Sequence, residues 1–220
     1  MIKGVIFDLD GTILNTIDDL SSAMNQMLTE FGYPAQHDLF YHKQSLGFGA
    51  RRYVKSCMPE EAAADDAKVD ACLARYRELY GSHASILTKP YEGIPEMMEA
   101  LSRKGIAINV LSNKPDAPTR ALVSEWFSQF KPQYVYGERP GLPRKPDPAV
   151  PLAIAEGLAL APCEMAFVGD SEVDIKTGIA AGMLPIGVLW GYRTREQLLE
   201  NGAALLAETP QDLVTLLQSK

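Results

Sequence analysis

Short apolar segments that are rich in β-branched residues alternate with segments of helical pattern along most of the chain. A strand, a helix and another strand in succession form the unit of a parallel sheet with helices on its faces. The almost continuous apolar character of these segments is typical of strands buried on both sides. Strands are expected at Ile2–Asp8, Ile106–Ser112, Gln133–Tyr136, Met165–Gly169 and Pro185–Leu189. Helices are expected near Asp116–Phe127, Pro148–Glu156 and Glu172–Ala181.

The alternation is interrupted from about Thr16 to His83, where helical spacing recurs and no convincing strand is found. Two apolar stripes in this stretch have the spacing of helix-packing faces. The first contains Ile17, Leu20, Met24, Met27, Leu28 and Phe31, and the second contains Val69, Cys72, Leu73, Tyr76, Leu79 and Tyr80. The sequence therefore predicts an α/β fold with a Rossmann-like parallel-sheet core, formed by residues 1–14 and 86–220, and an inserted all-helical cap domain over residues 15–85.

Composition limits the classes of partner. The 220 residues carry a net charge of −7, which argues against nucleic acid and anionic membranes as partners. The sequence contains no run of about 18 apolar residues, so no membrane span is expected. The three cysteines, Cys57, Cys72 and Cys163, have no paired spacing, so they are expected to be buried small hydrophobic residues in a reducing compartment. We expect a cytoplasmic protein that is a monomer or a homodimer.

The first predicted strand ends in two acidic residues, in the sequence GVIFDLDGTILNT. Because side chains alternate along a strand, Asp8 and Asp10 project to the same side, at the end of the strand where ligands bind in such sheets. Mg²⁺ would relieve the repulsion between two carboxylates and commonly binds one or two of them. Gly11 permits a sharp turn, and Thr12 offers a hydroxyl and an N–H to a ligand. The alternative is an acidic loop that only caps the next helix.

Three further segments place polar side chains at or after strand ends. VLSNK contains Ser112 and Asn113, which could bind a phosphate or could simply cap a helix. RKPDP contains Lys145, which could bind an anion or be solvated. FVGDSEVD contains Asp170 and Asp174, four residues apart and therefore on one face of a helix that begins there.

Carboxylates, one ammonium and one hydroxyl at a single sheet edge suit phosphoryl transfer, which depends on positioning and charge neutralisation. Other chemistries have less support. The chain has no GxSxG motif for acyl hydrolysis, no Walker P-loop and no GxGxxG, and its histidines, His37, His42 and His83, all lie in the helical insertion.

The motifs DLDGT, SNK, KPDP and GDSEVD, in this order, resemble those of the haloacid dehalogenase superfamily of aspartate-nucleophile phosphotransferases. The helical insertion directly after the first motif is similar to the small cap of one subclass. KPDPAVPLAIAEGL, GDSEVDIKTGIAAGM and LWGYR resemble the phosphoglycolate phosphatases in particular. Each motif is weak alone, but the ordered set spans nearly the whole chain and is specific.

The resemblance implies a role for each matching residue. Asp8 would be the nucleophile that forms an aspartyl-phosphate, and Asp10 would be the general acid and base. The Asp8 carboxylate, the Asp10 carbonyl and the Asp170 carboxylate would bind Mg²⁺, with Asp174 outside this ligand set. Ser112 and Lys145 would hold the phosphoryl oxygens. The residues expected to add further hydrogen-bond donors are Gly11, Thr12 and Asn113.

The resemblance also implies a substrate class, a small phosphorylated metabolite with 2-phosphoglycolate as the first candidate. In the insertion, SLGFGARR is the segment expected to contact the substrate, and Arg51 could bind a substrate carboxylate or be an ordinary exposed arginine.

Two alternatives to hydrolysis remain open. A sugar-phosphate mutase similar to β-phosphoglucomutase would share the site, although such relatives usually carry valine at the position of Thr12. A phospho-accepting regulatory switch would gather similar residues but would need no cap of this size.

Overall fold

The structure is a computed structural model that describes residues 1–35, 37–83 and 86–218. The chain divides into two compact units. The first, here called the core unit, contains Met1–Asn15 and Pro90–Lys220, and the second, the helical unit, contains Thr16–Lys89. The expected return to the core near residue 85 falls at residues 84–85, which lie outside the described residues. None of the helices in the described part of the chain is long and apolar enough to cross a membrane.

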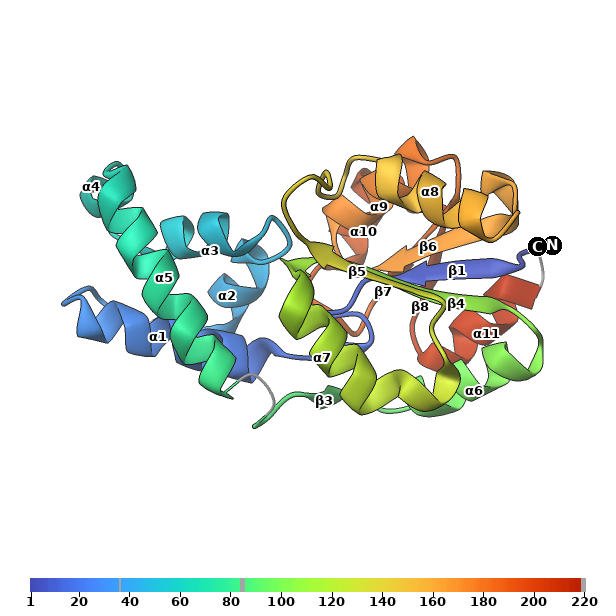
Figure 1. The fold of residues 1–220 in the computed structure, drawn as a ribbon, viewed down its shortest axis with the longest axis horizontal. Coiled ribbons are helices and arrows are strands. Elements are labelled where there is room, and N and C mark those ends of the chain that lie inside the picture. The colour runs from blue at the N-terminus through green and yellow to red at the C-terminus, as the bar shows by residue number, and fades with distance from the viewer. Residues whose placement is uncertain (36, 84–85, 219–220) are drawn as a thin grey trace. The chain divides into compact units, whose positions relative to one another are not determined.

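Within the described residues, the core unit contains a six-stranded sheet in the order β5-β4-β1-β6-β7-β8, and each adjacent pair is parallel. Strand β1 is central and pairs with β4 on one side and β6 on the other (Figure 1). The strands are β1 (Gly4–Phe7), β4 (Ala107–Pro115), β5 (Tyr134–Glu138), β6 (Met165–Gly169), β7 (Leu184–Val188) and β8 (Leu205–Ala207).

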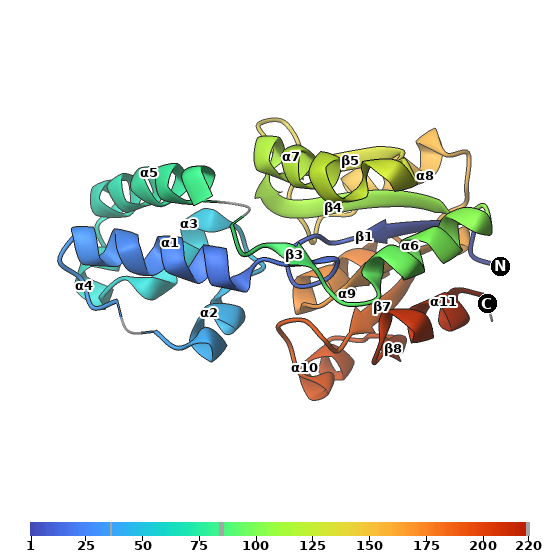
Figure 2. The same ribbon diagram turned by 90° about the horizontal axis from the view of Figure 1, so that it is seen from below.

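Helices cover both faces of this sheet, as Figures 1 and 2 show, and the alternation of side chains along β1 divides the core between them. The helices of the core unit are α6 (Ile94–Arg103), α7 (Asp116–Phe127), α8 (Ala149–Gly157), α9 (Glu172–Ala180), α10 (Arg195–Glu200) and α11 (Pro210–Gln218), with short 3-10 turns at Ser128–Phe130 and Pro162–Glu164. Val5 and Phe7 pack in the cluster that includes residues of α6, α7 and α11, whereas Ile6 packs in the cluster that includes residues of α8 and Ala181 at the end of α9.

The helical unit has its own apolar core, which includes Met24, Met27, Val54, Cys72 and Tyr76. Its helices are α1 (Ile17–Glu30), α2 (Leu39–Ser45), α3 (Ala50–Cys57), α4 (Glu60–Ala63) and α5 (Asp66–His83). Short strands β2 (Leu14–Asn15) and β3 (Lys89–Pro90), at the two points of the sequence where one unit ends and the other begins, form a two-stranded sheet.

A buried carboxylate joins the two ends of the helical unit. Asp19 in α1 accepts hydrogen bonds from the Thr88 amide at 2.8 Å, from the Thr88 hydroxyl at 2.7 Å and from the Leu87 amide at 3.1 Å. Because a buried carboxylate needs such donors, this contact ties the start of α1 to the segment that follows α5.

The predicted α/β class is confirmed, and the five predicted strands correspond to β1, β4, β5, β6 and β7. The sequence does not reveal β8, α6, α10 or α11. One expectation about the cysteines is wrong, because Cys163 is exposed while Cys57 and Cys72 are buried. Cys163 lies in the 3-10 turn Pro162–Glu164, where the chain enters β6 at the surface.

Helix α8 offers a test of the packing on one face of the sheet. Ile154 is fully buried in the cluster with Phe167, whereas Leu152 on the same helix is 39% exposed. We expect Ile154→Ala to lower the free energy of unfolding by about 2–5 kcal/mol, because it removes buried methylene groups and leaves a cavity. Leu152→Ala is the matched control and should cost less than about 1 kcal/mol. Urea denaturation followed by circular dichroism measures both, and equal losses would contradict the packing described.

Candidate active site

Asp8 is the first residue after β1, and its amide still donates to the Val168 carbonyl at 2.9 Å, as a continuing strand would. The chain then turns sharply, with the amides of Thr12, Ile13 and Leu14 all donating to the Leu9 carbonyl. Gly11 is required in this turn. Its φ of +82° is disfavoured for other residues, and a Cβ there would lie 2.8 Å from the carboxyl carbon of Asp170.

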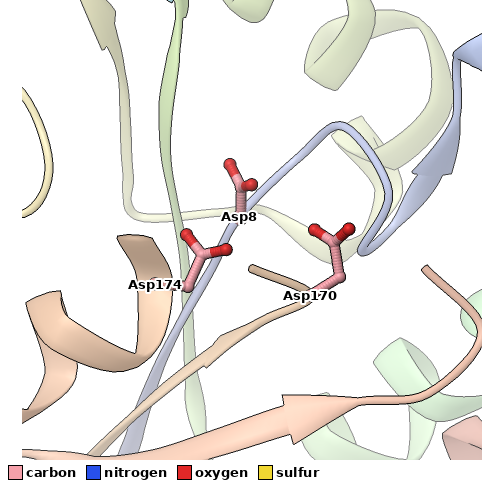
Figure 3. Close-up of side chains that lie close together, drawn as sticks. All are labelled: Asp8, Asp170 and Asp174. Atoms are coloured by element: carbon pink, nitrogen blue, oxygen red, sulfur yellow. The ribbon is translucent and has the colours of Figure 1, made fainter. Parts of the chain in front are cut away.

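Three buried carboxylates converge beside this turn, as Figure 3 shows. Asp8 follows β1, Asp170 follows β6, and Asp174 lies in the first turn of α9. Each offers an oxygen within 4.8 Å of the others, and none of the three residues is more than 7% exposed. We call these residues the carboxylate cluster. Like charges so close and so buried must be compensated.

Lys145 compensates part of this charge. Its ammonium lies 2.8 Å from Asp8 Oδ1 and 2.6 Å from Asp174 Oδ1, and its side chain is 2% exposed. The backbone of Lys145 is held by Asn113, whose side chain accepts from the Lys145 amide at 3.0 Å and donates to the Lys145 carbonyl at 3.1 Å. Burial alone would lower the pKa of Lys145, but the charges of Asp174 and Asp8 outweigh it and raise that pKa.

One ammonium does not balance the cluster. Burial, and next the charge of Asp174, raise the pKa of Asp8 to about 7 even though Lys145 acts against them. Burial and the charges of Asp174 and Asp8 raise the pKa of Asp170 as well. Both pKa shifts mean that burial and the repulsion between the carboxylates outweigh the positive charge near them. A divalent metal fits this set of residues, because it supplies the missing charge and prefers carboxylate oxygens as ligands.

Asp170 and Asp174 are oriented by hydrogen bonds that the sequence motifs do not predict. Asp170 accepts from the Thr12 hydroxyl at 3.1 Å and from the Tyr192 amide at 2.7 Å. Asp174 Oδ2 accepts from the Ser171 amide at 3.0 Å and the Ser171 hydroxyl at 2.6 Å. The Thr12 hydroxyl, expected to face a ligand, is therefore bonded to Asp170. The motif LWGYR, which contains Tyr192, is the only sequence signal for this loop among those considered above.

The remaining residues expected in the site are distributed between the two units. Ser112 is buried in β4, where its hydroxyl accepts from the Lys114 amide at 3.2 Å. The Asp10 carboxylate is not part of the carboxylate cluster and instead forms an ion pair with Lys114. Arg51 lies in the helical unit, where it forms ion pairs with Asp66 and Asp70.

Comparison with known proteins places this geometry in a family. Residues 5–188 match the family described as haloacid dehalogenase-like hydrolase. Phosphoglycolate phosphatase 1 of Pseudomonas aeruginosa is 30% identical over 214 residues, which cover 96% of this chain and 78% of that protein. Phosphoglycolate phosphatase of Xanthomonas campestris pv. campestris is 31% identical over 213 residues, which cover 96% of this chain and 94% of that protein.

Solved structures agree in fold. The crystal structure of a protein from Lactobacillus delbrueckii subsp. bulgaricus is similar to this structure, with a TM-score of 0.87 and 30% sequence identity, and the match covers 98% of both chains. A haloacid dehalogenase-like family hydrolase from Streptococcus pneumoniae has the same TM-score at 19% identity, again over 98% of both chains. At this low identity the match supports the fold alone.

Metal binding can be tested without measuring activity. We expect Mg²⁺ to raise the melting temperature of chelator-treated protein, because a divalent ion that binds only the folded cluster would balance its charge and stabilise the fold. At a hundredfold excess over the dissociation constant the gain is about 2.7 kcal/mol, or roughly 5–10 °C for a chain of this length. Differential scanning calorimetry with increasing Mg²⁺ measures the shift.

The variant Asp170→Asn should lose most of this shift, since it removes one of the three carboxylates. Glu156→Gln, which neutralises an exposed carboxylate on α8, should keep the full shift. An equal Mg²⁺ response in Asp170→Asn and in the wild type would contradict a metal site at the cluster.

Proposed function

The chain belongs to the haloacid dehalogenase-like hydrolase family, and from this membership and the site geometry we propose that it is a Mg²⁺-dependent phosphomonoester hydrolase that acts through an aspartyl-phosphate. The observation that carries the proposal is the placement of Asp8, at the carboxyl end of the central strand and in contact with Lys145. A buried carboxylate beside one fixed ammonium suits a nucleophile that must approach a phosphoryl group.

In this proposal the reaction has two halves. An oxygen of Asp8 attacks phosphorus, the bond from phosphorus to the leaving oxygen breaks, and Asp10 gives the leaving oxygen a proton. Asp10 then takes a proton from water as the water oxygen attacks phosphorus. The bond from phosphorus to Asp8 breaks, phosphate leaves, and both carboxyl groups return to their starting state.

The neighbouring residues position the phosphoryl group. Lys145 keeps Asp8 oriented and supplies positive charge, and the Ser112 hydroxyl is a donor for a phosphoryl oxygen. Asn113 acts by fixing the Lys145 backbone. Mg²⁺ would be held by Asp8 and Asp170, with the Asp10 carbonyl as a third protein ligand, and when bound it supplies charge neutralisation for the phosphoryl oxygens.

The net charge of −7 does not prevent an anionic substrate from binding. Charges at the protein surface are screened beyond a Debye length of about 8 Å. A unit charge pair at about 4 Å, with an effective dielectric constant near 20, is worth about 4 kcal/mol. Lys145 and a bound cation therefore dominate the potential felt by a phosphoryl group in the site.

The proposed substrate is 2-phosphoglycolate, which is the substrate class named for the relatives from Pseudomonas aeruginosa and Xanthomonas campestris. We assign the helical unit the role of a cap that selects the leaving group. Binding of the substrate carboxylate by Arg51 stays a prediction, and it requires Arg51 to exchange its present partners, Asp66 and Asp70. Cytoplasmic location and the choice between monomer and homodimer also stay predictions.

The nucleophile can be tested by one substitution. We expect Asp8→Asn to lower kcat at least about a thousandfold, because the amide cannot form the acyl phosphate. Phosphate release from 2-phosphoglycolate with Mg²⁺ is the measurement, and a melting curve checks that the variant folds. Glu156→Gln should keep wild-type kcat, and turnover retained in Asp8→Asn would refute the assignment.

The substrate class can be tested by a screen of small phosphomonoesters. We expect kcat/KM for 2-phosphoglycolate to exceed that for ethyl phosphate by about tenfold or more, because a site that binds a carboxylate discriminates against an analogue without one. Equal values would contradict carboxylate recognition. Isomerised sugar phosphate in place of released phosphate would instead support the mutase alternative, and a long-lived phosphoprotein without turnover would support the regulatory switch.

A further inference from the structure

A second buried lysine lies in the core unit beside the carboxylate cluster, and the roles assigned above do not use it. The Lys114 ammonium is 3.0 Å from Asp10 Oδ1 and 3.1 Å from Asp10 Oδ2. The side chain of Lys114 is 3% exposed, and that of Asp10 is 18% exposed. This is therefore a largely desolvated ion pair in which one ammonium contacts both carboxylate oxygens.

The backbone on both sides of Lys114 is fixed. Strand β4 continues through Lys114 to Pro115, and the Lys114 amide donates to the Ser112 hydroxyl at 3.2 Å. The Thr119 hydroxyl in α7 donates to the Lys114 carbonyl at 3.3 Å and to the Pro115 carbonyl at 2.9 Å. The Lys114 ammonium is thus positioned by the junction of β4 and α7, which is a different segment of the chain from the one that carries Asp10.

Asp10 lies beyond the end of β1, where, among the described residues, its backbone is held only by an isolated β-bridge to Leu14, so its side chain depends on such a partner for a fixed orientation. As the ionised base, Asp10 is held through both oxygens and cannot rotate freely about its side-chain bonds. As the acid, it carries the proton on one oxygen and can be held by the ammonium through the other. Proton transfer requires the acid or base to be held in a defined position. The Lys145 ammonium forms ion pairs with Asp8 and Asp174, so the two lysines contact different carboxylates.

We propose that Lys114 is a positioning residue that orients the Asp10 carboxylate for proton exchange with the leaving oxygen and with the attacking water. The proposal rests on the hydrolase function proposed above. Lys114 forms and breaks no covalent bond in either half-reaction. The proton moves from Asp10 to the leaving oxygen in the first half and from water to Asp10 in the second.

The substitution Lys114→Met removes the ammonium and keeps an unbranched apolar side chain. We measure kcat/KM, which reports the formation of the aspartyl-phosphate. For an alkyl phosphate, whose leaving oxygen needs a proton, kcat/KM should fall about 10- to 100-fold, a part of the full effect of a general acid. For p-nitrophenyl phosphate, whose leaving group departs without protonation, it should change less than about threefold.

Three comparisons separate positioning from a general loss of structure. Lys114→Arg should recover much of the activity towards the alkyl phosphate, because it restores a cation. In an Asp10→Asn background, Lys114→Met should have no further effect. Lys176→Met, which removes an exposed lysine on α9, should match the wild type. Equal losses with both substrates, a further loss in the Asp10→Asn background, or wild-type values in Lys114→Met would overturn the proposal.

A crystal structure of the Lys114→Met variant gives a readout that does not depend on the reaction. We expect the Asp10 carboxylate to leave its wild-type orientation, and an unchanged orientation would overturn the proposal. Should Lys114→Met fail to fold, Lys114→Gln is used in the same assays. A wild-type enzyme that releases no phosphate from any ester would count against the proposed hydrolase alone, because the orientation of Asp10 in the variant would still decide the role of Lys114.

Discussion

The ion pairs of Lys145 with Asp8 and Asp174 are the interaction on which the rest of the site depends. The ammonium bridges the carboxylate that follows β1 and one in the first turn of α9, at 2.8 and 2.6 Å. Without it, three carboxylates would be buried together, and Asp8 and Asp174 would lose the ammonium that contacts them both. Breaking a buried pair by removing one partner typically costs about 3–5 kcal/mol. The same contact that permits the cluster to fold therefore also sets the orientation of Asp8.

The fold brings these groups together because the strands are parallel and β1 is central. Asp8 and Asp170 follow neighbouring strands, and β4, on the other side of β1, carries Ser112 and Lys114. Carboxyl ends of parallel strands meet at one edge of a sheet, so segments far apart in sequence become neighbours. The apolar clusters on the two faces hold this edge in place while themselves carrying no chemistry.

The sequence predicted the strands that carry the candidate site. Asp8, Asp170 and Lys145, singled out because their motifs stand at strand ends in a recognisable order, lie close together in the structure, and their roles stay predictions. The sequence did not predict partners that depend on three-dimensional proximity. Thr12 bonds to Asp170, from another strand end, and Lys114 reaches Asp10 because β4 runs beyond Ser112 to Pro115 with an irregular register against β5. Short or weakly patterned elements such as β8 were missed, since three residues carry no clear periodicity.

The close approach of the Gly11 backbone to Asp170 has a consequence for how relatives of this protein can diverge. A side chain at position 11 would collide with the carboxyl group of Asp170, and Gly191 approaches the same group from the loop after β7. An aspartate with glycine on two sides cannot shift to admit a larger neighbour without abandoning its place in the cluster. In relatives of this sequence, Gly11, Asp170 and Gly191 should therefore be retained together or replaced together.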